Sequence, residues 1–560
     1  MRTPREVAHD LAEWLAGQMV EGSFPARTFY GEAFAIWLWS LFPGQFGHQI
    51  EALLPRALEQ LRREDVEAHP EFNLLALLGY CETQGLAPED VIGGFPPLRE
   101  TASSNWLLLG TLLRLRWNLS GGGRGFSEAL LRAHTRLLIL FQQQRDGLIR
   151  DDRLLDRRLP LPFPFSRGGP LGVRYDARLR GLSLQYHCFS LALLIDIHQL
   201  TGWTEVGRAI ERGLAAICRF VLDNGDSLYL GRGQEQIFGY GALLYALAAG
   251  SRSLGLPGFA PVWASVWRFM ASHQRDDGSF PLVLRSGEEG YPEVVNTSDP
   301  RWLGWYSYNN YFDYLPFLGV CLTRAAQAQA GESLGIDSPL VQGPGPGLVV
   351  TRLYAVVRES GWQAVVALPG GPRSQDQPVP YLCLNGRSVL PCFGGEEYAE
   401  GTYDLSMLPL PYVMRRDGRP VYPRDVMHWS LSQGEAQRTL VLRGSCDWAG
   451  FERRYTWGAG ELRMSDCLQV TDPPFELDEV RPLVFAAFGM NEQGDGSYQL
   501  HPGVPGFLLR IAGVEGSLHI DPGASPVGET WILSERVSWT GGGRRAFRRT
   551  LELSWGGQGE

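Results

Sequence analysis

The stretch "NGDSLYLGRGQEQIFGYGALLYALAA", residues 224–249, decides the fold, because one unit joins a polar turn to a long apolar helix. It begins with Asn-Gly, a pair that favours a change of chain direction. A polar segment with an arginine and a glutamate follows, and from Ile237 the residues are aromatic, aliphatic or small. The pattern predicts a buried helix whose polar start either is an ordinary helix beginning or lines a cleft.

The same unit recurs along the first 335 residues. A polar turn with Gly precedes a few apolar residues, and an aromatic residue then begins a long apolar helix. The other copies are "EGSFPARTFYGEAFAIWLWSLF" (21–42), "RDGLIRDD" (145–152) with "LSLQYHCFSLALLIDI" (182–197), and "DDGSFPLVL" (276–284) with "YSYNNYFDYLPFLGVCL" (306–322). A unit of roughly 45–70 residues that cannot bury its own apolar face predicts stacking of units. Helical hairpins stack into an open superhelix or close into a ring, and the aromatic-rich turns favour the ring.

The residue pattern of the sequence changes near residue 345. Segments such as "WQAVVALPGG" (362–371) and "ELRMSDCLQV" (461–470) are short, alternating and β-branched, which is typical of antiparallel sheet. We therefore expect an α+β multidomain protein. Its parts are an N-terminal (α/α) toroid of helical hairpins at 1–335, which is the catalytic domain, a linker at 336–347, and a C-terminal antiparallel β-sandwich domain at 348–560.

Composition excludes several functional classes. The chain is 44% hydrophobic and 11% aromatic, so it is globular with ample core. Its net charge is −10, and no basic stripe indicates a nucleic-acid partner. All 51 basic residues are arginine, which excludes Schiff-base lysine chemistry and a Walker A lysine. The scattered histidines predict no catalytic zinc, and we expect neither a metal nor a cofactor.

The N-terminal region carries no apolar core of signal-peptide length. Its longest apolar run, "FAIWLWSLF" (34–42), is too short to span a bilayer. The eight cysteines form no CxxC pair and are expected to be free thiols in a reducing compartment. We therefore expect a cytoplasmic protein without a membrane span, and the sequence leaves its oligomeric state open.

Four motifs occur in order along the helical part: "SSNWLLLGTLLRL" (103–115), "QRDGLIRDD" (144–152), "SLQYHCFSLALLI" (183–195) and "GRGQEQIFGYGALLYAL" (231–247). The ordered set resembles an uncharacterised toroid family of bacterial and fungal carbohydrate-degradation loci. More distantly it resembles heparinase II/III-like and alginate-lyase-like polysaccharide lyases, which join an (α/α) toroid to an antiparallel β domain.

The chain departs from the family pattern at two motifs. Ser104 stands where a second asparagine is common in the family. Gly233 and Gln236–Ile237 replace the Ser and the Tyr-Arg of the last motif. The missing arginine puts a direct transfer of substrate-binding detail in doubt.

The resemblance implies a lyase acting on an acidic polysaccharide or oligosaccharide. Such an enzyme neutralises a uronate carboxylate, removes the neighbouring proton and protonates the leaving oxygen. Asn105 would neutralise the carboxylate, and Tyr186 and His187 would supply base and acid. Arg232 would bind the acidic group through two parallel hydrogen bonds from its guanidinium. The residues expected to line sugar subsites, by stacking or hydrogen bonding, are Trp106, Trp305, Tyr308, Asn309, Asn310, Tyr311 and, from the β domain, His428.

Each of these residues also has a structural interpretation. Asn105 could cap the helix that begins at Trp106. Tyr186 and His187 are adjacent, so in a helix they point about 100° apart and one of them could belong to the core. Arg232 could pair with a structural carboxylate. The run 308–314 could be aromatic core with capping asparagines.

Two other functions remain open. An inverting glycoside hydrolase, such as a glucuronyl hydrolase, needs two carboxyl groups roughly 6.5–9.5 Å apart. Glu235 is its main candidate catalytic residue, and the other acids near the repeat turns are Asp146, Asp151, Asp277 and Asp313. The alternative from another class is a non-catalytic glycan-binding or scaffold protein of exopolysaccharide biosynthesis. The sugar and its linkage are not determined by the sequence.

Overall fold

The computed structural model divides into two compact units, Met1–Gly343 and Pro344–Glu560. The described residues are 2–63, 69–98, 103–120, 125–150, 183–230, 235–284, 308–329, 347–350, 354–368, 377–391, 411–421, 427–433, 438–525, 528–539 and 543–556. Among them, no helix combines the length and the apolar composition that crossing a membrane requires.

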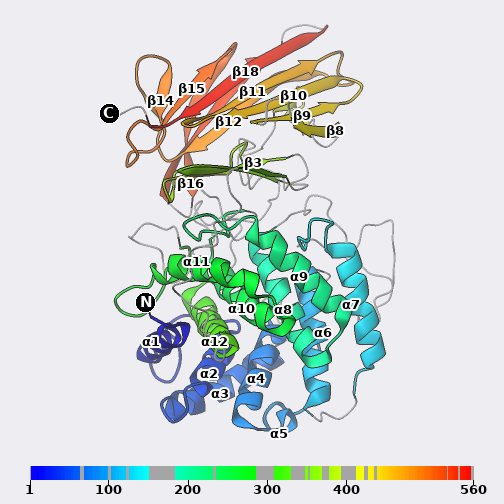
Figure 1. Ribbon diagram of the computed structural model, residues 1–560, viewed down its shortest axis with the longest axis vertical. Helices are drawn as coiled ribbons and strands as arrows, with labels where there is room; N and C mark the ends of the chain where they lie inside the picture. The colour runs from blue at the N-terminus through cyan, green and yellow to red at the C-terminus, as the bar shows by residue number, and fades with distance from the viewer. Residues whose placement is uncertain are drawn as a thin grey trace. The chain divides into compact units, whose positions relative to one another are not determined.

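Six helices of the first unit are apolar on nearly every face, so they need burial on all sides. They are α2 (Gly31–Ser40), α4 (Pro70–Gln84), α6 (Ser104–Leu119), α8 (Leu184–Thr201), α10 (Ile237–Leu254) and α12 (Tyr311–Gln329). Each packs against the next in the order α2–α4–α6–α8–α10–α12, and α12 packs against α2. The contacts therefore close into a ring of inner helices (Figure 1).

The remaining long helices of this unit are amphipathic and bury one face each. They are α1 (Pro4–Gly17), α3 (Gly47–Arg62), α7 (Glu128–Gln142), α9 (Thr204–Cys218) and α11 (Ala260–Ala271), with the short α5 (Pro88–Ile92) and the 3₁₀ turn η2 (Pro257–Phe259). In α9 the buried residues Val206, Ile210 and Leu214 recur at helical spacing. These helices lie outside the ring: α1 contacts α2 and α12, α3 contacts α2 and α4, and α9 contacts α8 and α10.

The repeated polar turns connect an outer helix to the next inner one. Each has a glycine with positive φ, which are Gly22, Gly147, Gly225 and Gly278. In the last three turns a side-chain oxygen accepts the backbone N–H two residues further on. The pairs are Asp146 with Leu148 (3.2 Å), Asn224 with Asp226 (3.0 Å) and Asp277 with Ser279 (2.9 Å). This is an Asx turn. Both Asp and Asn can make it, which explains why either residue occurs at this position.

These turns also dock each hairpin on the next one. A Cβ at Gly147 would lie 2.3 Å from the carbonyl oxygen of Arg212 in α9, and one at Gly225 would lie 2.2 Å from that of Ser265 in α11. Only glycine allows so close an approach of two backbones. Gly278, after α11, packs in the same way near the backbone of α1. The turn after the last outer helix thereby meets the first outer helix.

Asp313, in the first turn of α12, closes the inner ring. Its carboxylate accepts hydrogen bonds from the backbone N–H groups of Phe29 (2.9 Å), Tyr30 (2.9 Å) and Gly31 (2.7 Å). The first N–H groups of a helix have no partner within that helix, so α12 caps α2 from outside. Burial raises the pKa of Asp313 to about 6, against the opposing effect of these N–H donors.

The described strands of the second unit form three antiparallel sheets (Figure 1). The first has the order β1 (Gly347–Val350), β2 (Tyr354–Glu359), β3 (Trp362–Ala367), β4 (Tyr381–Leu384), β5 (Arg387–Ser388). The second has the order β13 (Asn491–Glu492), β14 (Ser497–Gln499), β15 (Leu508–Ala512), β18 (Arg545–Ser554), β11 (Glu461–Val470), β10 (Ala449–Trp457), β9 (Thr439–Ser445), β8 (His428–Gln433). The third has the order β16 (Ser517–Ser525), β17 (Gly528–Ser538), β12 (Leu477–Ala487), β6 (Tyr412–Arg415), β7 (Pro420–Val421).

The eight-stranded sheet shares its core with both smaller sheets. Tyr455 of this sheet packs in one cluster with Trp362 of the first sheet and Phe485 of the third. Along β10 buried and more exposed residues alternate, so one face of the sheet is core and the other points outward. With helices in one unit and antiparallel sheets in the other, the expected α+β class is confirmed.

We predict that Asp313→Asn lowers the free energy of unfolding of the helical unit by about 2 kcal/mol or more, because buried N–H groups of α2 lose charged acceptors. The matched control is Asp146→Asn. Asn224 occupies the equivalent turn position, so this change should be nearly neutral. Urea denaturation followed by far-ultraviolet circular dichroism measures both. Equal stability of the two variants would contradict a ring closed through Asp313.

Candidate functional site

The first turns of the inner helices meet at one end of the ring. His69, immediately before α4, has ring-centroid distances of 5.7 Å to Tyr30, 5.6 Å to Trp106 and 4.6 Å to Tyr308. These partners precede or begin α2, α6 and α12. Trp106 and Tyr308 are half-buried, whereas His69 and Tyr30 are buried. Four inner helices therefore contribute aromatic side chains to one cluster.

The starts of α8 and α10 join this cluster. The ring of Phe238 lies 5.3 Å from that of Tyr314 and 6.4 Å from that of Tyr186. Gln236 connects the same elements through its Oε1, which accepts hydrogen bonds from Gln185 Nε2 (2.7 Å) and the Tyr314 hydroxyl (3.1 Å). All six inner helices thus begin at the same end. Because a helix N-terminus carries partial positive charge, this end of the ring favours anions.

Asn105 is buried in the first turn of α6. Its Oδ1 accepts hydrogen bonds from the Ser103 hydroxyl (2.9 Å) and from the backbone N–H of Trp106 (3.0 Å). These bonds occupy the amide oxygen and orient the amide group. The geometry is that of a residue that fixes a helix start, and any contact with a substrate would be made through Nδ2.

Tyr186 and His187 face different surroundings, as their adjacency in a helix requires. Tyr186 is half-buried, near Phe238. His187 is completely buried, and its Nδ1 accepts the backbone N–H of Ile149 (3.0 Å) while its Nε2 lies 3.1 Å from the carbonyl oxygen of Gly213. Burial lowers the pKa of His187 to about 4, so the ring is neutral at pH 7. Through these two hydrogen bonds, His187 links the 143–149 turn to α9.

The segment before α12 has mixed roles. Tyr308 belongs to the cluster, and Asn309 donates from Nδ2 to the Tyr314 hydroxyl. Asn310 donates from Nδ2 to Asp313 Oδ2 (2.7 Å), and its Oδ1 accepts the N–H of Asp313 (3.0 Å). Tyr311 is buried beside Trp14 of α1. Asn310 and Tyr311 therefore serve the ring closure and the packing of α1.

Glu235 is fully buried and has positive φ, 61°, a conformation that is uncommon outside glycine. The Tyr240 hydroxyl lies 3.2 Å from Glu235 Oε2 and 2.9 Å from Asp226 Oδ1. Burial, and secondarily the two carboxylates, raise the pKa of Tyr240 well above its usual value. This group is a buried pair of acids around one phenol, and neither acid is exposed.

The other acids near the repeat turns have structural partners. Asp146 and Asp277 accept hydrogen bonds within their own turns, and Asp313 caps α2. Asp151, Arg232 and Trp305 lie outside the described residues, so the roles expected for them stay predictions.

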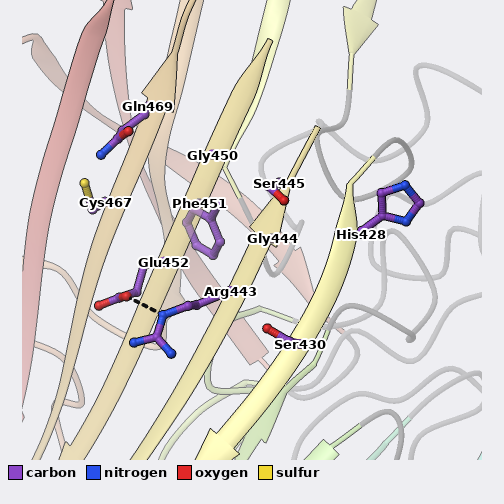
Figure 2. A pocket seen from close by; sticks show the side chains of 10 residues that line it. All are labelled: His428, Ser430, Arg443, Gly444, Ser445, Gly450, Phe451, Glu452, Cys467 and Gln469. Carbon is purple, nitrogen blue, oxygen red and sulfur yellow. Dashed lines mark hydrogen bonds and ion pairs between the residues drawn. The ribbon is translucent and has the colours of Figure 1, made fainter. Parts of the chain in front are cut away.

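His428 is exposed on β8, at the edge of the eight-stranded sheet among the described strands. It lines a groove on the outward face of that sheet, together with residues of β9, β10 and β11 (Figure 2). Its expected contribution to the cleft of the helical domain stays a prediction.

The sequence motifs predict no functional role for four members of the cluster: Tyr30, His69, Gln236 and Tyr314. Three of them stand at or before a helix start, which is the position that Tyr186 and Tyr308 also occupy in their own repeats. Aligning the repeats by their helix starts would have identified them. Burial, and then the neighbouring Tyr314, Asp313, Tyr308 and Tyr186, raise the pKa of Tyr30 well above its usual value. The Tyr30 phenol is therefore protonated at pH 7.

The C-terminal halves of the inner helices carry the opposite chemistry. Buried Asp196 of α8 accepts hydrogen bonds from Arg324 of α12 (2.6 Å) and Tyr245 of α10 (2.5 Å), and it lies 3.4 Å from Arg116 of α6. Burial alone would raise the pKa of Asp196, but Arg324 and Arg116 overcome this and hold it below its usual value. Arginines suit the negative ends of helices, so this network stabilises the ring.

Within the described residues, one group has the spacing to hold a metal ion: His9, Asp10 and Glu13 on α1. Asp10 also forms an ion pair with Arg2. None of these side chains belongs to the cluster at the helix starts.

Comparisons with known proteins yield similarity at the level of structure. No family model matches the chain, and no curated protein matches it. A chondroitin AC lyase of Streptomyces coelicolor is 11% identical over 98% of this chain and 79% of its own, with a TM-score of 0.46. A heparan sulfate lyase mutant of Pedobacter heparinus is 10% identical over 99% and 88%, with a TM-score of 0.35.

A glycosyl hydrolase family 88 protein of Bacteroides vulgatus is 12% identical over 59% of this chain and 99% of its own, with a TM-score of 0.37. The expected distant similarity to polysaccharide lyases is thus confirmed.

We predict that acid destabilises the helical unit through His187 and His134, whose pKa burial lowers to about 4. The unfolded histidine, with a pKa near 6.5, takes up its proton first. Stability is therefore full above pH 6.5 and falls as the pH drops from 6.5 to about 4. Each residue should contribute a loss of about 2 kcal/mol between pH 7 and pH 5.

Urea denaturation of His187→Asn and His134→Gln at both pH values measures these contributions. Each variant should lose less stability on acidification than the wild type. His48→Gln, which changes an exposed histidine of α3, should behave as the wild type does. An unchanged pH dependence in both buried-site variants would show that these histidines are protonated in the native protein.

Proposed function

We propose that this protein is a carbohydrate-active enzyme that cleaves a uronic-acid-containing polysaccharide or oligosaccharide by β-elimination. In this proposal the closed helical unit is an (α/α) toroid and the sheets form an antiparallel β sandwich. The observation that carries the proposal is the meeting of six helix starts around a cluster of tyrosines, a histidine, a tryptophan and amides.

The electrostatics of the helix starts suit such a substrate. A uronate is an anion, and removal of the proton next to its carboxylate concentrates further negative charge on the carboxylate oxygens. Helix N-termini aimed at that position stabilise the developing charge without reorganisation. The half-buried rings of Trp106 and Tyr308 offer faces on which a sugar ring can stack.

The proposed reaction uses few groups. Tyr186, as its phenolate, removes the proton at C5 of the uronate, the electron pair of that bond forms the C4=C5 double bond, and the C4–O bond to the leaving sugar breaks. The leaving oxygen takes a proton from Tyr186 or from a neighbouring group of the cluster. Asn105 donates from Nδ2 to the substrate carboxylate. Because both ring nitrogens of His187 are engaged with backbone, His69 replaces it as the candidate second proton-transfer group.

Glycoside hydrolysis is the second candidate function. The pair Asp226 and Glu235, joined through the Tyr240 hydroxyl, is the observation that favours it, since hydrolysis uses two carboxyl groups. Both acids are fully buried, so a substrate would reach them only after a rearrangement. Asn105 and His69 are buried as well, but the base of the elimination, Tyr186, is half-buried, and elimination is therefore preferred. The proposal includes the expected cytoplasmic location, where oligosaccharides would be the substrates.

The test is incubation with a panel of uronic-acid polysaccharides and oligosaccharides, following the ultraviolet absorbance of an unsaturated uronate together with new reducing ends. Both signals should rise. Tyr186→Phe should lower kcat by roughly 100-fold or more, because proton transfer to or from the phenol is lost. Tyr498→Phe, which changes a buried tyrosine of the β unit, is the control and should keep wild-type kcat.

The other outcomes discriminate between the alternatives. Reducing ends without new absorbance would identify a hydrolase, and Glu235→Gln would then be the variant to measure. Full activity of Tyr186→Phe would remove the phenol from the mechanism. No product on the whole panel would favour the glycan-binding or scaffold function.

A further inference from the structure

The outward face of the eight-stranded sheet contains a groove with a cavity volume of about 410 Å³. Four adjacent strands, β8 to β11, form its floor and walls (Figure 2). Strand register explains which side chains meet there. His428 pairs with Ser445, Ser445 with Gly450, and Gly450 with Gln469, so these four residues form one row across the strands. At a strand spacing of ~4.8 Å the row is about 14 Å long, the size of a short oligosaccharide.

Gly450 creates the hollow at the centre of this row. A Cβ built there meets no atom within 4 Å, so the position is open and faces outward. The next outward positions of the same strand carry the long side chains of Glu452 and Arg454. Glycine weakens a strand, and its presence inside one is typical of a place that a ligand approaches closely.

The walls offer hydrogen-bonding groups of the kinds that recognise hydroxyls and carboxylates. His428 and Gln469 stand on the two outer strands of the groove, with Ser445 between them (Figure 2). In the next row Arg443 donates from Nε to Glu452 (2.8 Å), and Arg454 also donates to Glu452 (3.3 Å).

The local charge is positive although the chain as a whole carries −10. Glu452 is one carboxylate between the two guanidinium groups of Arg443 and Arg454. A third guanidinium, that of Arg544, donates to Gln469 Oε1 (2.5 Å) at the end of the row. An acidic ligand therefore finds Arg443 in the groove, with Arg454 and Arg544 bonded to its lining residues Glu452 and Gln469, and a planar guanidinium can pair with a carboxylate.

We propose that this groove is a binding site for a uronic-acid-containing oligosaccharide segment, separate from the helix-start cluster. The choice of ligand rests on the proposed function. The groove holds a segment of the sugar substrate that is not being cleaved. Hydroxyl groups of this segment form hydrogen bonds with His428, Ser445 and Gln469. A carboxylate of the segment pairs with Arg443, and a sugar ring lies over Gly450. Such a site raises the affinity for long chains by adding a second point of attachment.

The decisive variant is Gly450→Tyr, which fills the hollow. The matched control is Thr456→Tyr, on the same strand and the same outward face but outside the groove. Fluorescence polarisation measures the binding of labelled oligosaccharides from hyaluronan, alginate and polygalacturonate, with a labelled maltodextrin as the neutral reference. At least one acidic probe should bind the wild type and Thr456→Tyr equally, and Gly450→Tyr at least tenfold more weakly.

A native thiol gives a second readout that does not depend on a substitution. Cys467 lines the groove and is half-buried, while Cys446 is half-buried outside the groove. Alkylation with iodoacetamide followed by peptide mass spectrometry should show that the acidic probe slows labelling of Cys467 and leaves that of Cys446 unchanged. This measurement holds even if Gly450→Tyr folds poorly, which its melting temperature would reveal.

The outcomes separate this inference from the proposed function. Binding that is lost in Gly450→Tyr, without cleavage of any substrate, supports the groove and opposes the lyase. Cleavage with equal binding by the wild type and Gly450→Tyr, and no protection of Cys467, overturns the groove alone. Binding of the neutral maltodextrin as tightly as the acidic probes, or of no acidic probe, also overturns it.

Discussion

The carboxylate of Asp313 is the interaction on which the helical unit depends. It comes from the last inner helix and caps the first, so the ring closes through three backbone N–H groups. Without this closure, α2 and α12 would be the two ends of an open superhelix, each with an apolar face exposed. A Cβ at Gly31 would lie 1.6 Å from the Phe312 carbonyl oxygen, so the carboxylate reaches its partners only because this residue is glycine. One acid and one glycine, almost 300 residues apart in the chain, thus decide between solenoid and ring.

Closure also gives the ring two chemically different ends. The positive ends of six helices meet phenols, amides and one histidine, and their combined field favours an anion there. The C-terminal halves carry Arg116 and Arg324, which share buried Asp196. A charged network in the core is costly unless every member has partners, and its position at the helix C-terminal halves reduces that cost. The same macrodipoles therefore require cations at one end and suit an acidic substrate at the other.

The second unit shows a comparable division between core and outward face. In β10 the buried positions pack against other sheets, and buried Arg453 is paired with Asp466 of β11. The outward positions of β9, β10 and β11 are free of that constraint and carry Arg443, Gly450 and Gln469 of the groove. Two places with polar groups suited to an acidic sugar thus occur in one chain, one built from helix starts and one from a strand register.

Periodicity and turn chemistry were sufficient to predict the elements. The apolar helices, the Asp-Gly and Asn-Gly turns and the change to sheet near residue 345 depend on local sequence, because helix burial and turn conformation are set within a few residues. Local sequence left both an open superhelix and a closed ring possible, and the aromatic-rich turns only favoured the ring. The composition of the helix-start cluster was predicted only in part: Trp106, Tyr186 and Tyr308 were selected, but Tyr30, His69 and Tyr314 were not.

What the sequence determined by itself is therefore the kind of element at each position and the polar character of the helix starts. The tertiary structure decided which of two neighbouring residues serves the core. Local rules do not distinguish Tyr186 from His187, but the turn at Ile149 and helix α9 engage the two ring nitrogens of His187 with backbone, whereas Tyr186 stays half-buried. It likewise made Asp313 a cap, because its partners lie on another helix. Contacts between distant segments are not encoded in local propensity, and they appear only when the ring closes.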